Sequence, residues 1–134
     1  MDLVETVIVA GLGCRRGASA ASVKAVIEAA LARTSYAKCD LGVIATAVTK
    51  RSEEGIAAAA SALGVPLVFI PLVDLQSASA RTLTRSARVA ALIGVPSVAE
   101  AAALAAGGPA ARLIAARIAL DGVTCALADT EAAR

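Results

Sequence analysis

Histidine is absent from this chain of 134 residues, and its absence removes much familiar chemistry. No Ser–His–Asp triad and no Cys–His pair can form, and the commonest general base and metal ligand are both missing. Any reaction must therefore use carboxylates, lysine, hydroxyl groups, cysteine or water. We expect neither a metal site nor a cofactor.

Aromatic residues are also scarce, since Tyr36 and Phe69 are the only two. The formal net charge at pH 7 is +2, from 13 basic and 11 acidic residues. Nucleic-acid binding usually needs a strongly basic surface and aromatic rings that stack on bases. The composition therefore argues against a nucleic-acid partner.

Long apolar runs are missing too, although 58% of the residues are hydrophobic. Much of that fraction is alanine, and the most hydrophobic window, Ala57–Val73, is interrupted by Gly64, Pro66 and Pro71. A membrane-spanning helix needs about 20 consecutive, mostly apolar residues. The start, MDLVE, is acidic where a secretory leader would be basic. We expect a soluble, cytoplasmic protein without a membrane partner.

The three cysteines are odd in number and widely spaced, which predicts neither a disulfide framework nor a zinc site. Cys39 and Cys125 are expected in the core. Cys14 precedes two arginines near a predicted helix start, where its pKa could be lowered. Because no histidine can act as its base, we favour a small packing residue in a loop.

The apolar pattern of the first half predicts alternating strands and helices. Helical periodicity begins at Ser19, with Ser19 or Ser22 as the N-cap, and recurs over Glu53–Leu63. Short β-branched runs predict strands over Thr6–Ala10, Leu41–Ala47 and Leu67–Leu72.

The second half is less regular. The polar stretch Asp74–Ser86 predicts a loop, with a short helix toward Ile93. Ser97, followed three residues later by Glu100, forms a capping box that opens a helix ending at Gly107–Gly108.

The end of the chain is ambiguous between helix and strand, but Asp121–Gly122 lies between two apolar runs and favours an antiparallel hairpin. The element order predicts one α/β domain over residues 1–134. We expect three layers, α/β/α, around a mainly parallel sheet of about five strands with a C-terminal antiparallel hairpin. In such sheets ligands bind outside the carboxyl ends of the strands.

The segment GLGCRRG, Gly11–Gly17, follows the first predicted strand. It is not a dinucleotide fingerprint, because the third glycine comes one residue late, and it is not a Walker loop. Exposed N–H groups, a helix start and the pair Arg15 and Arg16 predict a site for a carboxylate or phosphate. The alternative is a tight turn with solvated arginines.

The second predicted strand is followed by Lys50 and Glu53, which should lie at the same edge of the sheet. Lys50 could contact an anion or act as an acid. Glu53 and Glu54 also suit the first turn of a helix because they complement its dipole. Glu100 likewise has a complete explanation as a capping residue.

Three segments, with the closing VTCALA, resemble the CobE family in the order in which they occur. They are GLGCRRGASAASVKAVI, TKRSEEGIAAAASALGVPLVFI and GVPSVAEAAAL. The same domain forms the C-terminal part of CbiG, and the resemblance extends to Ala128. Its markers are G-x-G-C-R-R-G, K-x-x-E-x-G and G-V-x-S-V-x-E-x-x-A-L.

The resemblance places the family pattern on residues of all three segments, including Gly55, Gly94 and Val98. The positions that it implies for ligand binding are Gly11, Gly13, Cys14, Arg15, Arg16, Gly17, Lys50, Glu53, Ser97 and Glu100.

The resemblance implies a cobalamin biosynthesis protein of the aerobic route, in which cobalt enters late. Its ligand would be a metal-free precorrin or corrin, whose carboxylates suit arginines and backbone N–H groups. It would carry this intermediate or deliver it to other pathway enzymes such as methyltransferases.

Two alternatives stay open. CbiG opens a ring δ-lactone of a cobalt-precorrin and releases acetaldehyde, so a hydrolase like cobalt-precorrin-5A hydrolase is the second hypothesis. Lys50 or Glu53 would then be the catalytic acid or base. A nucleotide-binding module is the third hypothesis. The sequence does not decide whether the protein is an enzyme.

Overall fold

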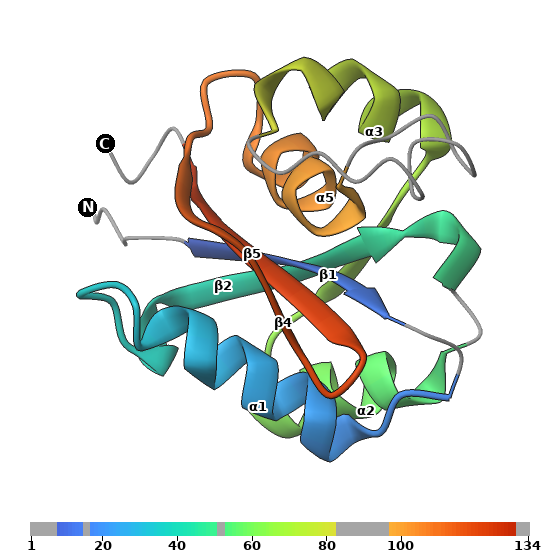
Figure 1. Ribbon diagram of the computed structural model, residues 1–134, viewed down its shortest axis with the longest axis vertical. Helices are drawn as coiled ribbons and strands as arrows, with labels where there is room; N and C mark the ends of the chain where they lie inside the picture. Colours follow the sequence, from blue (N-terminus) through green and yellow to red (C-terminus); the bar gives the residue numbers. More distant parts are fainter. Residues whose placement is uncertain (1–7, 15–16, 51–52, 83–96, 131–134) are drawn as a thin grey trace.

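The computed structural model describes residues 8–14, 17–50, 53–82 and 97–130. Its five strands form one sheet in the order β3-β2-β1-β5-β4 (Figure 1). The predicted α/β class is confirmed. The strands are β1 (Ile8–Cys14), β2 (Leu41–Ala47), β3 (Leu67–Ile70), β4 (Leu113–Leu120) and β5 (Val123–Asp129).

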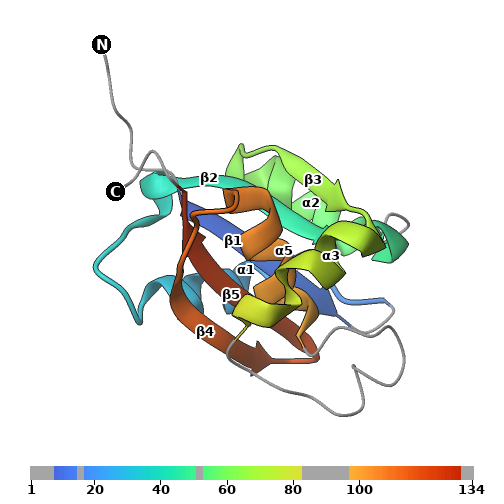
Figure 2. The same ribbon diagram turned by 90° about the horizontal axis from the view of Figure 1, so that it is seen from above.

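Helices cover both faces of the sheet (Figure 1), and the described residues place two of them on each face. On one face lie α1 (Ala20–Leu31) and α2 (Glu54–Leu63), and on the other lie α3 (Leu72–Ala78) and α5 (Val98–Gly107). Figure 2 shows α5 crossing over β1 and β5. Among the described residues, no helix is long and apolar enough to cross a membrane. Short 3₁₀ turns occur at Lys38–Asp40, Val48–Lys50 and Ser79–Arg81.

The sheet is mixed. The predicted parallel arrangement holds for β1, β2 and β3, whereas β5 runs antiparallel to both of its neighbours, β1 and β4. The predicted hairpin joins β4 to β5 at Asp121 and Gly122, whose φ angles of 58° and 80° are those of a type I′ turn. Because the hairpin inserts β5 beside β1, the centre of the sheet combines both kinds of pairing.

The first strand was predicted to end at Ala10, and this boundary is wrong. The strand continues to Cys14, since Leu12 pairs with Thr46 of β2 and Cys14 pairs with Val123 of β5. Two neighbours hold the backbone extended through the glycines, and this cooperative pairing outweighs their weak strand propensity.

The predicted strand at Leu67–Leu72 and the loop after it need a second correction. The strand stops at Ile70, and Pro71, with φ of −63°, is the N-cap residue of α3. Leu75 and Ala78, three residues apart, are the buried positions of this helix. The helix predicted toward Ile93 lies outside the described residues.

The remaining caps agree with the sequence. Ser19 accepts a hydrogen bond from the Ser22 N–H, and Ser97 accepts one from the Glu100 N–H, so both are N-caps. Gly64 ends α2 with φ of 73°. Cys125 is buried as predicted, but Cys39 is exposed in the turn before β2, so its predicted core position is wrong.

Candidate functional site

A pocket of about 680 Å³ opens where the chain leaves β1 and β2. One wall is Gly17–Ala20, which leads into α1, and the other comprises Glu53–Gly55 and Ala58 of the α2 start. Because β1 and β2 are parallel, both segments follow carboxyl ends of strands and lie at the same edge of the sheet. The two loops are therefore adjacent, as the sequence predicted.

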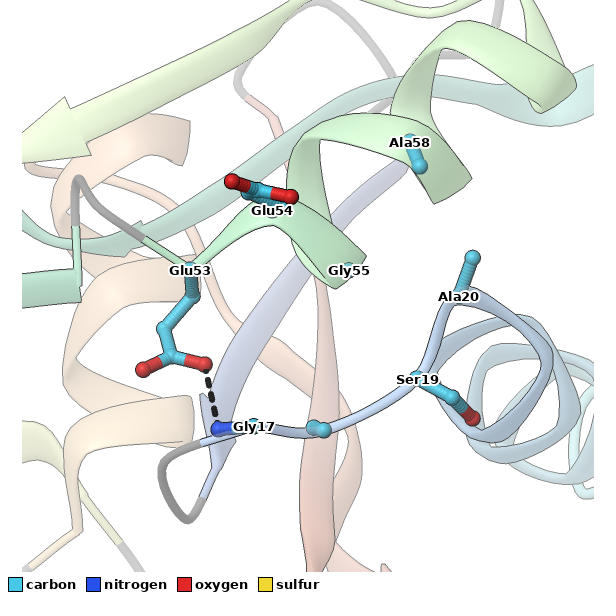
Figure 3. Close-up of a pocket in the computed structure, with 8 residues that line it drawn as sticks. Gly17, Ser19, Ala20, Glu53, Glu54, Gly55 and Ala58 are labelled. Carbon is cyan, nitrogen blue, oxygen red and sulfur yellow. Dashed lines mark hydrogen bonds between the residues drawn. The ribbon is translucent and has the colours of Figure 1, made fainter.

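A hydrogen bond joins the two walls. The Gly17 N–H donates to Glu53 Oε1 at 2.9 Å (Figure 3). Gly17 has φ of 82°, a conformation that favours glycine. Glu53 is the N-cap residue of α2, but its side chain makes no capping bond to its own helix. The carboxylate thus bridges two segments that are 36 residues apart.

The two walls also touch through their backbones. A Cβ atom on Gly55 would lie 2.0 Å from the carbonyl oxygen of Ala18, so no side chain fits at this position. Gly55 therefore lets the first turn of α2 contact the segment that opens α1. This contact brings Glu53 within reach of Gly17.

Two helix N-termini consequently flank one pocket, and each carries partial positive charge. Small residues dominate the walls, with Ala18, Ala20 and Ala58 among them. Glu54 also lines the pocket, but its carboxylate points away from Gly17 (Figure 3). The pocket thus combines backbone N–H donors with a partly apolar surface of small side chains.

The N-terminus of α1 is tied to the C-terminal hairpin as well. Ser22 Oγ donates to Asp121 Oδ2 at 3.1 Å, and Ser19 Oγ donates to Ser22 Oγ at 3.0 Å. Asp121 is one of the two turn residues of the hairpin. The start of α1 is therefore fixed by contacts to both α2 and the β4–β5 turn.

Cys14 and Lys50 complete the group of predicted residues near this edge. Burial raises the pKa of the half-buried Cys14 thiol; the Lys50 ammonium lowers it and the Glu53 carboxylate raises it, with a net increase. The lowered pKa that the neighbouring arginines suggested is wrong. A thiol that stays protonated at neutral pH agrees with a packing role for Cys14.

Gly11 and Gly13 lie inside β1 and are buried. A Cβ atom on Gly11 would be 2.0 Å from the carbonyl oxygen of Ala99 in α5, and one on Gly13 would be 2.8 Å from Thr124 Oγ1. The structure therefore gives both glycines packing roles beneath neighbouring elements. Neither residue lines the pocket.

Ser97 and Glu100 are buried at the start of α5, on the opposite face of the sheet from α1 and α2. Glu100 Oε2 accepts a hydrogen bond of 2.8 Å from the Arg117 N–H. Arg117 lies where the pairing of β4 with β5 shifts register, between Ala115 and Ile118. The carboxylate thus accepts a hydrogen bond from a backbone amide at a point where the β4–β5 pairing is irregular.

The structure accordingly brings Cys14, Gly17, Lys50 and Glu53 to one edge of the sheet. It places Gly11 and Gly13 inside β1, and Ser97 and Glu100 at the start of α5 on the opposite face. The predicted ligand-binding residues Arg15 and Arg16 lie outside the described residues. Within the described ranges, no three His, Cys, Asp or Glu side chains are grouped to hold a metal ion.

Sequence reasoning did not select Ser19, Ala20 or Ala58 as pocket residues. Alanine and serine carry no chemical signal of a site, so the sequence offered little to find them. Gly55 did have a signal, because it is the last position of K-x-x-E-x-G. The structure explains this spacing, since Glu53 binds Gly17 and Gly55 permits the backbone contact that brings them close.

Comparison with known proteins places the chain in a family. Residues 8–128 match the family model described as Cobalamin synthesis G C-terminus. The Protein CobE of a Sinorhizobium species is 38% identical over 121 residues, which cover 90% of this chain and 79% of that protein. The cobalt-precorrin-5A hydrolase of Priestia megaterium is 36% identical over 73 residues, but these cover only 20% of that enzyme.

A solved structure gives the same result. The crystal structure of CobE, a protein from the cobalamin (vitamin B12) biosynthetic pathway, superimposes with a TM-score of 0.88 at 35% identity. The match covers 96% of this chain and 94% of that one. The chain therefore belongs to the family of the cobalamin synthesis G C-terminus, a family of cobalamin biosynthesis proteins that includes CobE.

Proposed function

We propose that the protein binds a carboxylate-rich, metal-free precorrin or corrin intermediate in the pocket at the carboxyl ends of β1 and β2. One observation carries this proposal. The Gly17–Glu53 hydrogen bond joins the G-x-G-C-R-R-G and K-x-x-E-x-G segments at one pocket, although they are far apart in the sequence. Two of the three segments that carry the family resemblance thus meet at one site.

The backbone at the pocket suits carboxylates, whereas the charged side chains that line it among the described residues are the acids Glu53 and Glu54. The N-termini of α1 and α2 offer backbone N–H groups and partial positive charge. The positive charge of Lys50 lies near Cys14 at the same edge of the sheet. Arg15 and Arg16 precede Gly17 directly in the chain, and guanidinium groups bind carboxylates with two parallel hydrogen bonds. These arginines are our candidates for the main ionic contacts.

The volume and the small lining residues of the pocket leave room for a flat macrocycle. The volume of about 680 Å³ lies within the range of small-molecule sites. Glycine and alanine dominate its walls, so a broad ring can approach the backbone closely. We infer that the protein carries its ligand to other enzymes of the pathway, with methyltransferases as the candidate recipients.

A titration with hydrogenobyrinic acid, a metal-free corrinoid, tests the site through the visible spectrum of the ligand. We expect saturable binding that the double variant Arg15→Ala/Arg16→Ala weakens at least about tenfold, because each lost charge-assisted hydrogen bond contributes about 1.5–3 kcal/mol. Arg33→Ala is the matched control. Arg33 is exposed beyond the C-terminal end of α1, whereas the pocket lies at the N-terminal end.

Two results would contradict the proposal. Wild-type protein that shows no saturable spectral change would remove the corrinoid as ligand. Equal losses of affinity in the double variant and in Arg33→Ala would move the ligand away from the pocket.

A hydrolase is the second candidate, and the match to cobalt-precorrin-5A hydrolase favours it. Lys50 and Glu53 would supply the acid and base. The charges of both shift the pKa of Cys14, so the two side chains lie near each other at the same edge of the sheet. Release of a two-carbon product from a purified lactone intermediate would support this function if Glu53→Gln abolished it. Binding without product release would leave the carrier role.

A further inference from the structure

The carboxylate of Glu53 occupies a backbone donor that an incoming ligand carboxylate would need. We propose that Glu53 is a built-in competitor, which the ligand must displace from the Gly17 N–H before it can bind fully. This inference rests on the proposed function and adds a control on the affinity and selectivity of the same pocket.

The contact has the features of an internal substitute for a ligand. Glu53 stands at the N-cap of α2, where a short polar side chain usually binds its own helix, yet its carboxylate reaches across to the other wall. Among the described residues, the Gly17 N–H is the single hydrogen-bond partner of the Glu53 side chain. Figure 3 shows Glu53 directed at Gly17, whereas its neighbour Glu54 points elsewhere.

Displacement requires little rearrangement. Glu53 is half-buried and precedes the first turn of α2, so rotation about its side-chain bonds removes the carboxylate without moving the helix. The close backbone contact between Gly55 and Ala18 keeps the pocket walls together while the side chain moves. A ligand carboxylate then restores the hydrogen bond that the protein gives up.

Internal competition favours ligands large enough to contact several groups of the pocket at once. A small carboxylate that reaches only the Gly17 N–H, whether it carries one carboxylate group or three, exchanges one hydrogen bond for another and gains nothing. A ring with many carboxylates also gains nothing where one of its carboxylates replaces Glu53. Its other carboxylates form additional contacts, and these form readily because the bound ring holds them at high effective concentration. Glu53 would therefore exclude common small carboxylates while admitting the proposed ligand.

The test removes the Glu53 carboxylate and measures the affinity of the protein for citrate, a small tricarboxylate. We expect Glu53→Ala to bind citrate about fivefold to tenfold more tightly than wild type, and Glu53→Gln to fall between them, because a neutral acceptor bonds more weakly. Glu54→Ala is the matched control. It removes the same charge from the next residue without touching Gly17, and a change of less than about twofold is expected.

The Gly17 amide signal in a nitrogen–proton NMR spectrum supplies a readout that a structural role would not move. In wild type this signal should lie downfield because it is bonded to a carboxylate. It should move upfield in Glu53→Ala and return when citrate is added. The same titrations are repeated with hydrogenobyrinic acid.

The outcomes separate the two proposals. If wild type fails to bind the corrinoid but Glu53→Ala gains affinity for citrate, the proposed function fails and the competitor stands. Corrinoid binding by wild type, with citrate affinity in Glu53→Ala no higher than in Glu54→Ala, would overturn the competitor alone. Should Glu53→Ala not fold, the Glu53→Gln titration decides, and unchanged citrate affinity overturns the inference.

Discussion

The pocket side and the α5 side of the sheet each use a glutamate to accept a backbone N–H from another element. Glu100, in the first turn of α5, accepts from Arg117 and is fully buried, whereas Glu53 accepts from Gly17 and is half-buried at the pocket. The hydrogen bonds are alike, at 2.9 Å and 2.8 Å, but their surroundings differ. Full burial makes the Glu100 carboxylate a fixed part of the fold, whereas the partial exposure of Glu53 permits the exchange that we propose.

The two glycines of the first segment differ in the same way. Gly11 lies against the backbone of α5, where no Cβ atom fits, whereas a Cβ atom on Gly17 would meet nothing within 4 Å. One glycine is required by packing, and the other by its positive φ angle. A single short motif can thus serve the core at one end and a binding site at the other.

The largest expected effect sharpens this glycine comparison. Gly11→Ala should lower the free energy of unfolding by about 3 kcal/mol or more, because the new methyl group meets helix backbone that cannot yield easily. Gly17→Ala should cost only about 1 kcal/mol, from its left-handed backbone. Urea unfolding of both variants measures the difference. Similar losses in the two variants would break the comparison.

The glutamate comparison predicts the next effect. Glu100→Ala should lower the free energy of unfolding by about 2–3 kcal/mol, since it leaves the Arg117 N–H without this acceptor inside the protein. Glu100→Gln keeps an acceptor oxygen and should cost less. Chemical denaturation of these variants beside Glu53→Ala gives the ranking. A larger loss for Glu53→Ala than for Glu100→Ala would contradict the assignment of roles.

The smallest effect concerns two cysteines, one inside the sheet and one at the pocket edge. Burial raises the pKa of Cys125 from 9.0 to about 12, so the unfolded chain loses its thiol proton first as the pH rises. The contribution of this thiol to the free energy of unfolding is fully present below pH 9. It falls between pH 9 and pH 12, because over that range the thiol ionises in the unfolded chain but not in the folded one. We expect wild type to lose about 1 kcal/mol more than Cys125→Ala between pH 7 and pH 10.

Unfolding at a series of pH values measures this difference. The Cys14→Ala variant is the control, because Cys14 is only half-buried and the Lys50 ammonium opposes the effect of burial on its pKa. Parallel stability curves for wild type and Cys125→Ala would show that the buried thiol has an ordinary pKa.

The fold was largely predictable because its strongest signals are local. The bounds of β2 match the predicted Leu41–Ala47, and the Ser19, Ser97 and Gly64 caps occur where side-chain chemistry placed them. The errors at the end of β1 and at α3 arose from tertiary contacts. Pairing on both sides extended β1 through glycine, and a helix began directly after Pro71.

The position of the pocket was predictable, but most of the residues that line it were not. Parallel strands placed Gly17 and Glu53 at one edge, which the sequence order alone implied. Whether a motif residue faces the pocket or the core depends on which helix covers it. The approach of α5 to Gly11, and of Glu100 to Arg117, has no signature in a single sequence.

The position of β5 has a consequence for how the chain acquires its structure. Leu12 pairs with Cys125, so a strand near the start is completed by one near the end. Contacts of such sequence separation give a high contact order and slow folding. During synthesis the edge of β1 that pairs with β5 stays open until β5 leaves the ribosome, so the nascent chain carries an apolar strand with one unpaired edge, which favours aggregation or chaperone binding.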